Sequence, residues 1–455
     1  MRKLFFLIVS IAFLGCQFTL AQDTLHTKLI ENDPIRAKED SLYRKIELKT
    51  QKSKIGRRLH ELLFTSGASV PATTAPSKPK VSSVWKDFQG KIIRHIEITT
   101  YDPLGFDEQD STRLPNRWEV LGNRFHNKTK EKIVRRLLLF KAYTPLDSIK
   151  MKETARVLRS QYHIRRVYIQ PKTTHSADSV DVKVNVLDSW SLYADAMGSF
   201  NEGTMRVFER NFLGLGHQLS GRYSQEIRGK GRPSFGMDYE ILNLYATTLN
   251  TSAGYSLNFD KYYYQYWELT RPYYSLYSRW AAGVHLYQRT FEEGLPKEDS
   301  IYSQDFKTQG RNVWGSISFP ILKRYTPANR VTNMVFSLRY YRVKYIEGPD
   351  SWLDSEGFYS DKDTYLASIG VNHIGYEQDR YIFRHQDIED IPIGRSVALI
   401  GGFQENLGHR TPYLAGRLRY GAYFSLGYFS GDIQLGSFLA QERSKQTTLR
   451  WEFNY

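Results

Sequence analysis

The histidines are the side chains of this sequence best suited to chemistry, and their spacing argues against catalysis. The chain has 11 His, but no two stand at the spacing of a His-Glu-x-x-His metal site, and no carboxylate cluster accompanies them. Isolated residues such as His217, His285 and His373 are interpreted as polar groups of a lumen or rim rather than as metal ligands. No Gly-x-Ser-x-Gly turn or phosphate-binding glycine loop occurs. We expect no enzyme, no cofactor and no bound metal.

Two acidic stretches contain enough carboxylates to suggest calcium binding. They are residues 291–305, FEEGLPKEDSIYSQD, and residues 348–363, GPDSWLDSEGFYSDKD. Neither stretch places its carboxylates at the ordered positions of a calcium loop. We interpret both as extracellular loops.

The N-terminus has the pattern of a secretory signal peptide, predicted to span residues 1–21. Two positive charges precede an apolar run from Leu4 to Gly15, and cleavage is expected after Ala21. The run is shorter than the roughly 20 residues that a helix needs to cross a bilayer. Cys16 is the single cysteine, so the mature chain has no disulfide and no thiolate metal site. Lipidation at Cys16 is the alternative.

The composition suits an exported β-protein, either a membrane barrel or a soluble one. Aromatic residues make up 14% of the chain, with 32 Tyr against 8 Trp. Abundant tyrosine suits a transmembrane β-barrel, in which aromatic girdles mark both interfaces and only one face of each strand meets lipid. The formal net charge is +15, but the basic residues are scattered, and export argues against nucleic acid. Anionic lipid head groups or an anion-attracting lumen explain the charge better.

The mature chain divides into three regions. Residues 22–90 are predicted to form a charged helical segment followed by a Ser/Thr/Pro-rich linker. Residues 91–189 have an α+β pattern in the order strand, helix, helix, strand, strand. Asn127 or Thr129 is expected to cap the first helix, and Asp147 the second. One face of the second helix is predicted to carry Met151, Ala155, Leu158 and Tyr162.

Residues 190–455 are predicted to form an antiparallel β-barrel. Apolar and polar residues alternate over long segments, and residues 413–429 are interpreted as one such strand. We count about 12 or 13 strands, whereas single-chain bacterial barrels have an even number. The barrel is therefore expected to be incomplete, with the chain stopping before its last strands. The alternative is that Tyr455 is the true terminus.

One hairpin motif begins the predicted barrel. The stretch ERNFLGLGHQL, residues 209–219, is interpreted as a strand, a tight turn and a second strand. Spaced glycines supply the positive φ angles that such a turn requires. The residues assigned to this motif are Glu209, Arg210, Asn211, Phe212, Gly214 and Gly216.

The order of these segments resembles the outer-membrane assembly superfamily, which includes BamA, TamA and the two-partner-secretion transporters, also called bacterial surface antigens. Residues 122–138, 146–169 and 180–188 resemble its periplasmic POTRA module. The hairpin motif and residues 389–394, EDIPIG, resemble segments of its barrel. The resemblance implies an α+β POTRA module followed by an all-β antiparallel transmembrane barrel. The chain departs from the family in having one such module and no Val-Arg-Gly-Phe/Tyr motif.

The resemblance implies a protein that inserts or translocates polypeptides at the outer membrane of a Gram-negative bacterium. Its N-terminal domain would lie in the periplasm, and its partners would be outer-membrane lipids, unfolded polypeptide clients and periplasmic accessory proteins. A POTRA strand edge can add a client strand through backbone hydrogen bonds. The strand assigned to this edge comprises Arg165, Arg166, Val167, Tyr168, Ile169 and Gln170.

Two alternatives remain open from the sequence. The first is a passive channel or surface receptor, in which Arg339, Arg417 and Arg419 face the lumen and favour anions. The second is a truncated and inactive product.

Overall fold

The computed structural model describes residues 85–106, 115–229, 231–321, 332–379, 382, 388–424, 427–439 and 446–455. These residues belong to one compact unit, which begins at Lys80. The predicted signal peptide and nearly all of the predicted helical segment and linker lie outside the described residues.

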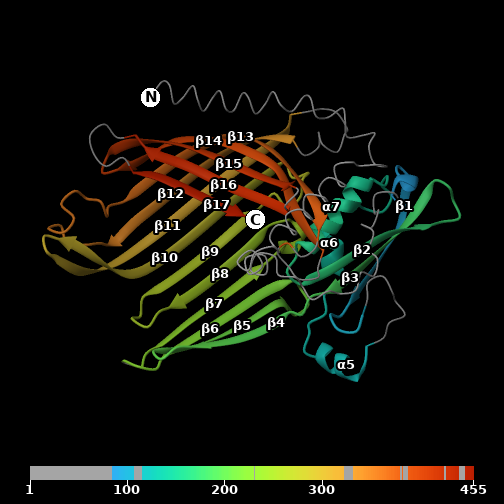
Figure 1. The fold of residues 1–455 in the computed structure, drawn as a ribbon, viewed down its shortest axis with the longest axis horizontal. Coiled ribbons are helices and arrows are strands. Elements are labelled where there is room, and N and C mark those ends of the chain that lie inside the picture. Colours follow the sequence, from blue (N-terminus) through green and yellow to red (C-terminus); the bar gives the residue numbers. More distant parts are fainter. Residues whose placement is uncertain are drawn as a thin grey trace, which may run out of the picture. The chain divides into compact units, whose positions relative to one another are not determined.

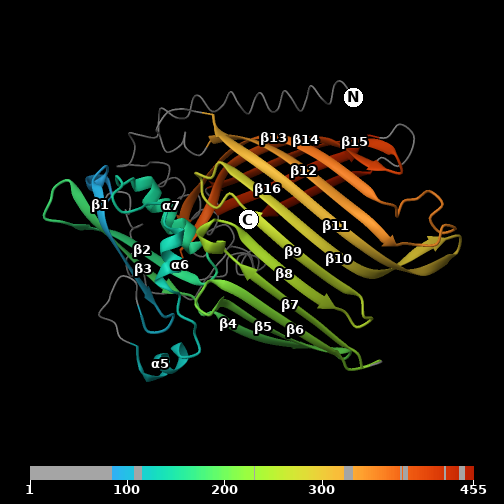
Figure 2. The ribbon, with the colours of Figure 1, turned by 180° about the vertical axis from the view of Figure 1, so that it is seen from behind.

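Residues 85–188 form an α+β domain around a three-stranded mixed sheet of order β1-β3-β2. The central strand β3 is parallel to β1 and antiparallel to β2, as Figure 1 and Figure 2 show from opposite sides. Its elements are η1 (Lys86–Phe88), β1 (Ile92–Tyr101), α5 (Arg117–Asn123), α6 (Glu131–Leu137), α7 (Ser148–Arg159), β2 (Ile164–Thr173) and β3 (Ser179–Asp188). The short helix α5 follows β1 and was not expected from the sequence.

The core of this domain is formed by the alternating apolar residues of β3. Val180, Val182, Val184 and Val186 are fully buried, because alternate residues of a strand point to the same face. Helix α7 packs its own apolar residues against this core. Its buried apolar residues are Met151, Val157 and Leu158.

Two predictions about the helices are wrong and one is confirmed. Tyr162 does not belong to the buried face of α7, since the helix ends at Arg159 and Tyr162 is 51% exposed. Neither Asn127 nor Thr129 caps α6, whose N-cap residue is Lys130 without a side-chain hydrogen bond. Asp147 does cap α7, since its Oδ1 accepts from the Ile149 amide at 3.0 Å.

Residues 192–454 form one antiparallel sheet of 14 strands, in which every strand pairs with its neighbours in sequence. This exceeds the predicted count. The strands are β4 (Leu192–Gly198), β5 (Glu202–Phe212), β6 (His217–Glu226), β7 (Pro233–Ile241), β8 (Asn250–Leu257), β9 (Tyr263–Arg271), β10 (Trp280–Lys297), β11 (Ser300–Pro320), β12 (Thr332–Glu347), β13 (Lys362–Asp379), β14 (Glu389–Asn406), β15 (His409–Phe424), β16 (Gly427–Phe438) and β17 (Thr447–Asn454), with η2 (Leu244–Ala246) between β7 and β8.

The prediction that residues 413–429 form one strand is wrong, because the segment contains parts of β15 and β16. Strand β15 ends at Phe424, and β16 begins at Gly427 with a φ of 135°. Alternation continues across the turn, so periodicity alone does not reveal the reversal. The acidic residues 291–305, expected in a loop, instead pair as the ends of β10 and β11.

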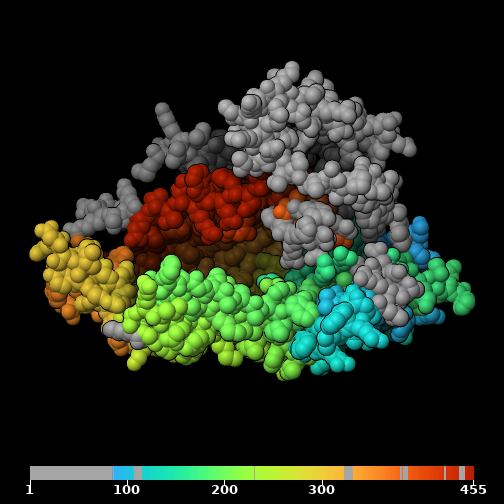
Figure 3. Space-filling view, turned by 60° about the horizontal axis from the view of Figure 1, so that its bottom comes forward, coloured from blue at the N-terminus to red at the C-terminus, as the bar shows by residue number. Residues whose placement is uncertain are grey.

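The sheet has two ends and two edges. Because all neighbouring strands are antiparallel, alternate turns lie at the same end. The β5–β6 and β9–β10 turns contact the α+β domain, and we call their end the domain end and the opposite one the far end. The edge strands of the described sheet are β4 and β17. Figure 3 shows a hollow between the green strands that follow β4 and the red strands that precede the C-terminus.

Candidate functional site

The hairpin motif of β5 and β6 contacts the α+β domain through one buried amide. Asn211 is fully buried, and its Nδ2 donates to the Asn127 carbonyl oxygen at 2.6 Å and to Thr129 Oγ1 at 2.9 Å. Its Oδ1 accepts from the Gly216 amide at 2.8 Å. The same side chain therefore closes the predicted turn and joins the sheet to the α+β domain. We call this region, with the α7 contacts described below, the junction.

The glycines of the motif allow the two backbones to approach. Gly214 has a φ of 68°, and its carbonyl oxygen accepts from the Lys130 amide at 3.1 Å. A Cβ at Gly214 would collide with the Lys128 carbonyl oxygen. Gly216 has a φ of 70°, and a Cβ there would lie 2.7 Å from Cε1 of the His163 ring. Both positions require glycine for its conformation and for its size.

We predict that Gly216→Ala weakens the junction by about 2 kcal/mol, because the methyl group meets the His163 ring and the positive φ disfavours alanine. Hydrogen exchange of the Lys130 amide, which bonds to Gly214, should accelerate by about 30-fold. Gly221→Ala is the matched control, since Gly221 has no atom within 4 Å of its Cβ position. Equal exchange rates of the Lys130 amide in Gly216→Ala and Gly221→Ala would contradict this role of Gly216.

A second cluster ties the end of β3 to the start of the sheet. Asp188 Oδ2 accepts from the Thr129 amide at 2.7 Å and contacts His126 Nε2 at 3.0 Å. His126 Nδ1 lies 3.2 Å from Ser191 Oγ, just before β4. All four residues are buried. Burial raises the pKa of Asp188, and the hydrogen bonds from His126 and Thr129 oppose that rise.

Helix α7 contacts the sheet through a largely buried ion pair. Arg159 donates from Nε and Nη2 to the two carboxylate oxygens of Asp390, at 2.9 and 2.7 Å. Their side chains are only 6% and 13% exposed. Asp390 belongs to EDIPIG, so both sheet motifs singled out in the sequence contact the α+β domain. Charge-assisted pairs with two parallel hydrogen bonds fix orientation as well as distance.

The same helix also contacts the turn between β9 and β10. Glu153 Oε1 accepts from the Leu276 amide at 2.8 Å, and Arg156 Nη2 donates to the Tyr274 carbonyl oxygen at 3.1 Å. Glu153 and Arg156 also pair with each other at 2.8 Å. The Arg156 guanidinium lies 4.4 Å from the ring centroid of Tyr376 on β13. Helix α7 is thus bound by three separate parts of the sheet.

We predict that Asp390→Ala destabilises the protein by about 3 kcal/mol, because Arg159 keeps a buried charge without its partner. Denaturant unfolding of the detergent-solubilised protein measures this loss. Adding Arg159→Met to the Asp390→Ala variant should recover part of the lost unfolding free energy, which a double-mutant cycle detects. The matched control is Asp195→Ala, whose exposed pair with Arg206 should contribute less than about 1 kcal/mol. Similar losses at Asp390 and Asp195 would refute the role of burial.

His163 makes the junction sensitive to acid. The ring is buried, and neither nitrogen has a hydrogen-bond partner among the described residues. Burial, followed by repulsion from His126 and His217, lowers the pKa of His163 to about 4. An unfolded histidine titrates near about 6.5. Protons therefore bind more tightly to the unfolded state, and stability is lost as pH falls from about 6.5 through about 4.

We predict a loss of about 3 kcal/mol from His163 across this pH window, since one pKa unit corresponds to about 1.4 kcal/mol. His163→Phe keeps a flat ring against Gly216 and removes the titration. As pH falls from 7.5 to 4, the unfolding free energy of the wild type should drop by about 3 kcal/mol relative to that of His163→Phe. Parallel pH curves would show that His163 does not titrate in this way.

The residues assigned to a client-binding strand lie in an edge strand. Among the described strands, β2 pairs only with β3, and residues 165–170 are all partly exposed. The start of the opposite edge, β1, is covered, since Ile93 exchanges backbone hydrogen bonds with Tyr143 and Thr144 at 2.7 and 3.1 Å. Val167 and Ile169 pack toward the core, so Tyr168 points to the other face.

The three arginines assigned to a lumen lie on one face of the sheet but not in one cluster. Arg417 and Arg419 both bind Asp432, each with a 2.9 Å hydrogen bond from Nε. Arg339 lies on β12 and donates to Asn312 Oδ1 at 2.9 Å. The shared carboxylate leaves Arg417 and Arg419 with one net positive charge, which weakens their predicted role in attracting anions.

Sequence reasoning missed most residues of the junction. Asp390 lay within EDIPIG, and Arg159 and His163 lay within residues 146–169, which also resemble the family. No local pattern indicated that these three residues lie where the α+β domain contacts the sheet. Within the residues that the structure describes, no group of three or more His, Cys, Asp or Glu is placed to hold a metal ion. No described helix is long and apolar enough to cross a membrane.

The fold thus combines an α+β domain with a 14-stranded antiparallel sheet, joined by a buried polar junction. No protein-family model and no curated protein matches the chain.

Three solved structures show a weak similarity. CdiB from Acinetobacter baumannii is 11% identical over 91% of this chain and 92% of that chain, with a TM-score of 0.33. CdiB from Escherichia coli is 9% identical over 90% and 97%, with a TM-score of 0.27. BamA from Haemophilus ducreyi lacking POTRA domains 1–3 is 9% identical over 79% and 84%, with a TM-score of 0.29. Scores this low do not assign the chain to a family.

Proposed function

We propose that this protein is an outer-membrane β-barrel protein that inserts or translocates polypeptides, and that its α+β domain is a periplasmic POTRA module. The sequence motifs that resemble the outer-membrane assembly superfamily support the proposal. So does their position, because the hairpin motif and EDIPIG both bind the α+β domain at the domain end of the sheet. A barrel that works together with its periplasmic domain needs such a fixed connection.

An exposed apolar row on the sheet supports the membrane location. Paired residues across consecutive strands bring large apolar side chains into one line on one face. Each is between 38% and 57% exposed, and a row of this length is unusual on a surface that faces water. The row consists of Trp280, Ile317, Phe336, Ile369 and Leu399.

The edges of the sheet bear on the same proposal. In lipid, every backbone N–H and C=O group must find a partner, which a sheet achieves only by closing or by pairing its edges. We infer that β4 and β17 are paired in the membrane, either with each other or with other strands. Every strand in between except β8, which has 8 residues, reaches the 9–11 or so that a tilted strand needs, and the longest are β11 with 21 residues and β10, β13 and β14 with 18 each.

The proposal of client capture rests on the edge of β2 that faces away from β3. Its N–H and C=O groups on the side away from β3 face no described strand, and an extended client segment pairs with such an edge with little demand on sequence. The junction fixes β2 relative to the sheet, because α7 directly precedes β2 and binds Asp390. The client is thereby held at the domain end of the barrel.

We predict that a photocrosslinker at Tyr168 captures unfolded outer-membrane clients, whereas one at Tyr101 at the end of β1 does not. Proline at Val167 and at Tyr168 tests the pairing, since neighbouring residues direct their N–H groups to opposite sides of the strand. One of these two variants removes only an outward N–H and should keep native stability. That variant should lose about tenfold in client crosslinking.

Two outcomes would contradict client capture at β2. One is unchanged client crosslinking in the proline variant that remains folded. The other is equal crosslinking from Tyr168 and Tyr101, which would indicate that clients contact the domain without using the open edge.

A further inference from the structure

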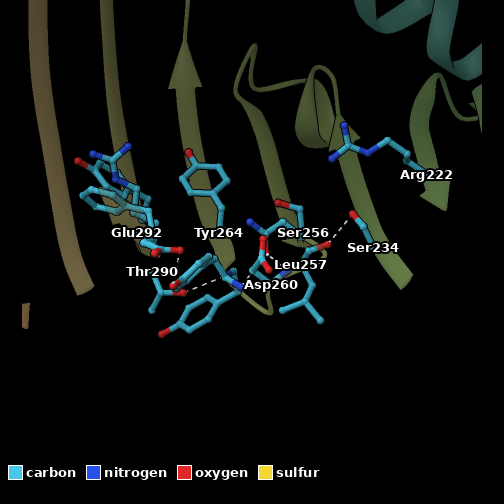
Figure 4. Close-up of a pocket in the computed structure, with 14 residues that line it drawn as sticks. Arg222, Ser234, Ser256, Leu257, Asp260, Tyr264, Thr290 and Glu292 are labelled. Carbon is cyan, nitrogen blue, oxygen red and sulfur yellow. Dashed lines mark hydrogen bonds between the residues drawn. The ribbon is translucent and has the colours of Figure 1, made fainter. Parts of the chain in front are cut away.

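A cavity of about 650 Å³ opens on the sheet across β6 to β10, toward its far end. Figure 4 shows Arg222 extending from one side of this cavity toward Ser256 and Tyr264, with Thr290 and Glu292 on the other side. The cavity lies away from the junction and from β2, so neither accounts for it. Its volume falls within the roughly 300–1,000 Å³ of known ligand pockets.

The side chains of the cavity form a row in strand register. Arg222 pairs with Gly236, Gly236 with Ser256, Ser256 with Tyr264 and Tyr264 with Arg289, on five consecutive strands. Paired residues of antiparallel strands point to the same face. Gly236 leaves space in the row, since a Cβ there would lie 3.8 Å from Arg222 Nη2. The two arginines stand four strand spacings apart, roughly 19 Å at about 4.8 Å per spacing.

The charges of this row are not balanced within the described part of the chain. Among the described residues, no carboxylate forms an ion pair with Arg222 or Arg289. The Arg289 guanidinium contacts Thr308 Oγ1 from Nε at 3.4 Å and lies 4.5 Å from the ring centroid of Phe291. Of the two described carboxylates that line the cavity, one forms an ion pair with an arginine and the other accepts from hydroxyl groups. Asp260 binds Arg232 at 2.6 Å, and Glu292 accepts from Tyr262 at 3.3 Å. Two cations therefore remain available to an anionic ligand.

Tyrosines on β9, β10 and β12 form a fixed aromatic surface beside the arginines. The Tyr264 ring is stacked on Tyr266 at a centroid distance of 5.5 Å and lies 6.0 Å from Tyr287. Tyr287 and Tyr341 are joined by a 2.9 Å contact between their hydroxyl oxygens. Gly310 makes room for the Tyr287 ring, which would overlap any Cβ at that position. The rings are held in place before a ligand arrives.

We propose that this row is a binding site for an acidic oligosaccharide, a short chain of sugars that carry carboxylates. Arg222 and Arg289 would each bind one carboxylate, the Tyr264 face would pack against a sugar ring, and Ser256 would bond to a sugar hydroxyl. A peptide strand is a poorer occupant, because every strand from β6 to β10 is already paired on both sides. Recognition here must use side chains, and these offer hydroxyl, guanidinium and aromatic groups.

Calorimetric titration of the full chain in detergent micelles with tri-galacturonic acid tests the proposal. Binding should be measurable, should weaken with added salt, and should fall by about tenfold or more in Arg222→Gln and in Arg289→Gln. Tyr264→Ala should lose a similar amount. Arg339→Gln is the matched control, since it removes one positive charge from the same face outside the cavity, and it should change affinity by less than about twofold.

Other results would overturn the proposal. Absence of binding at millimolar tri-galacturonic acid would refute the site. Equal losses in Arg339→Gln and Arg222→Gln would show a general charge effect of the face. Equal binding of maltotriose would exclude a role for the two cations, and tighter binding of tri-glutamate would identify an acidic peptide as the ligand instead. None of these outcomes bears on client capture at β2.

Discussion

One buried amide joins the α+β domain to the β5–β6 turn of the sheet. Asn211 receives one hydrogen bond from its own turn and donates two to the α+β domain. A buried polar group left without partners is costly, so the turn and the segment from Asn127 to Thr129 are each stable only when the other is in place. The position of the α+β domain relative to the sheet follows from that mutual requirement.

Further contacts convert this connection into a fixed orientation. Helix α7 binds EDIPIG through Arg159 and binds the β9–β10 turn through Glu153 and Arg156. Contacts from β5, β9–β10 and β14 come from well-separated strands of the sheet, and three separated attachments resist rotation in every direction. The polar character of these contacts also makes them sensitive to pH, because His163, whose nitrogens meet no hydrogen-bonding group of the described residues, must remain neutral within them.

The two proposed modes of recognition are separated along the molecule. At β2 the backbone itself is available, because that strand has a described partner on one side only. On β6 to β10 the backbone is fully paired, so only side chains remain to select a ligand. An edge accepts many sequences, whereas a row of arginine and tyrosine side chains selects for charge and ring shape. The proposed functions follow from this difference in available groups.

The sequence by itself determined the local structure of this protein. Alternation in β3, the cap at Asp147 and the turn glycines all follow from nearest neighbours in the chain, and the structure contains each of them. Strand number was misjudged because alternation runs on through the β15–β16 turn. Only the tertiary structure decided the junction, since Asn211 and Thr129, or Arg159 and Asp390, are far apart in sequence. No local pattern encodes which distant partner a buried polar group will find.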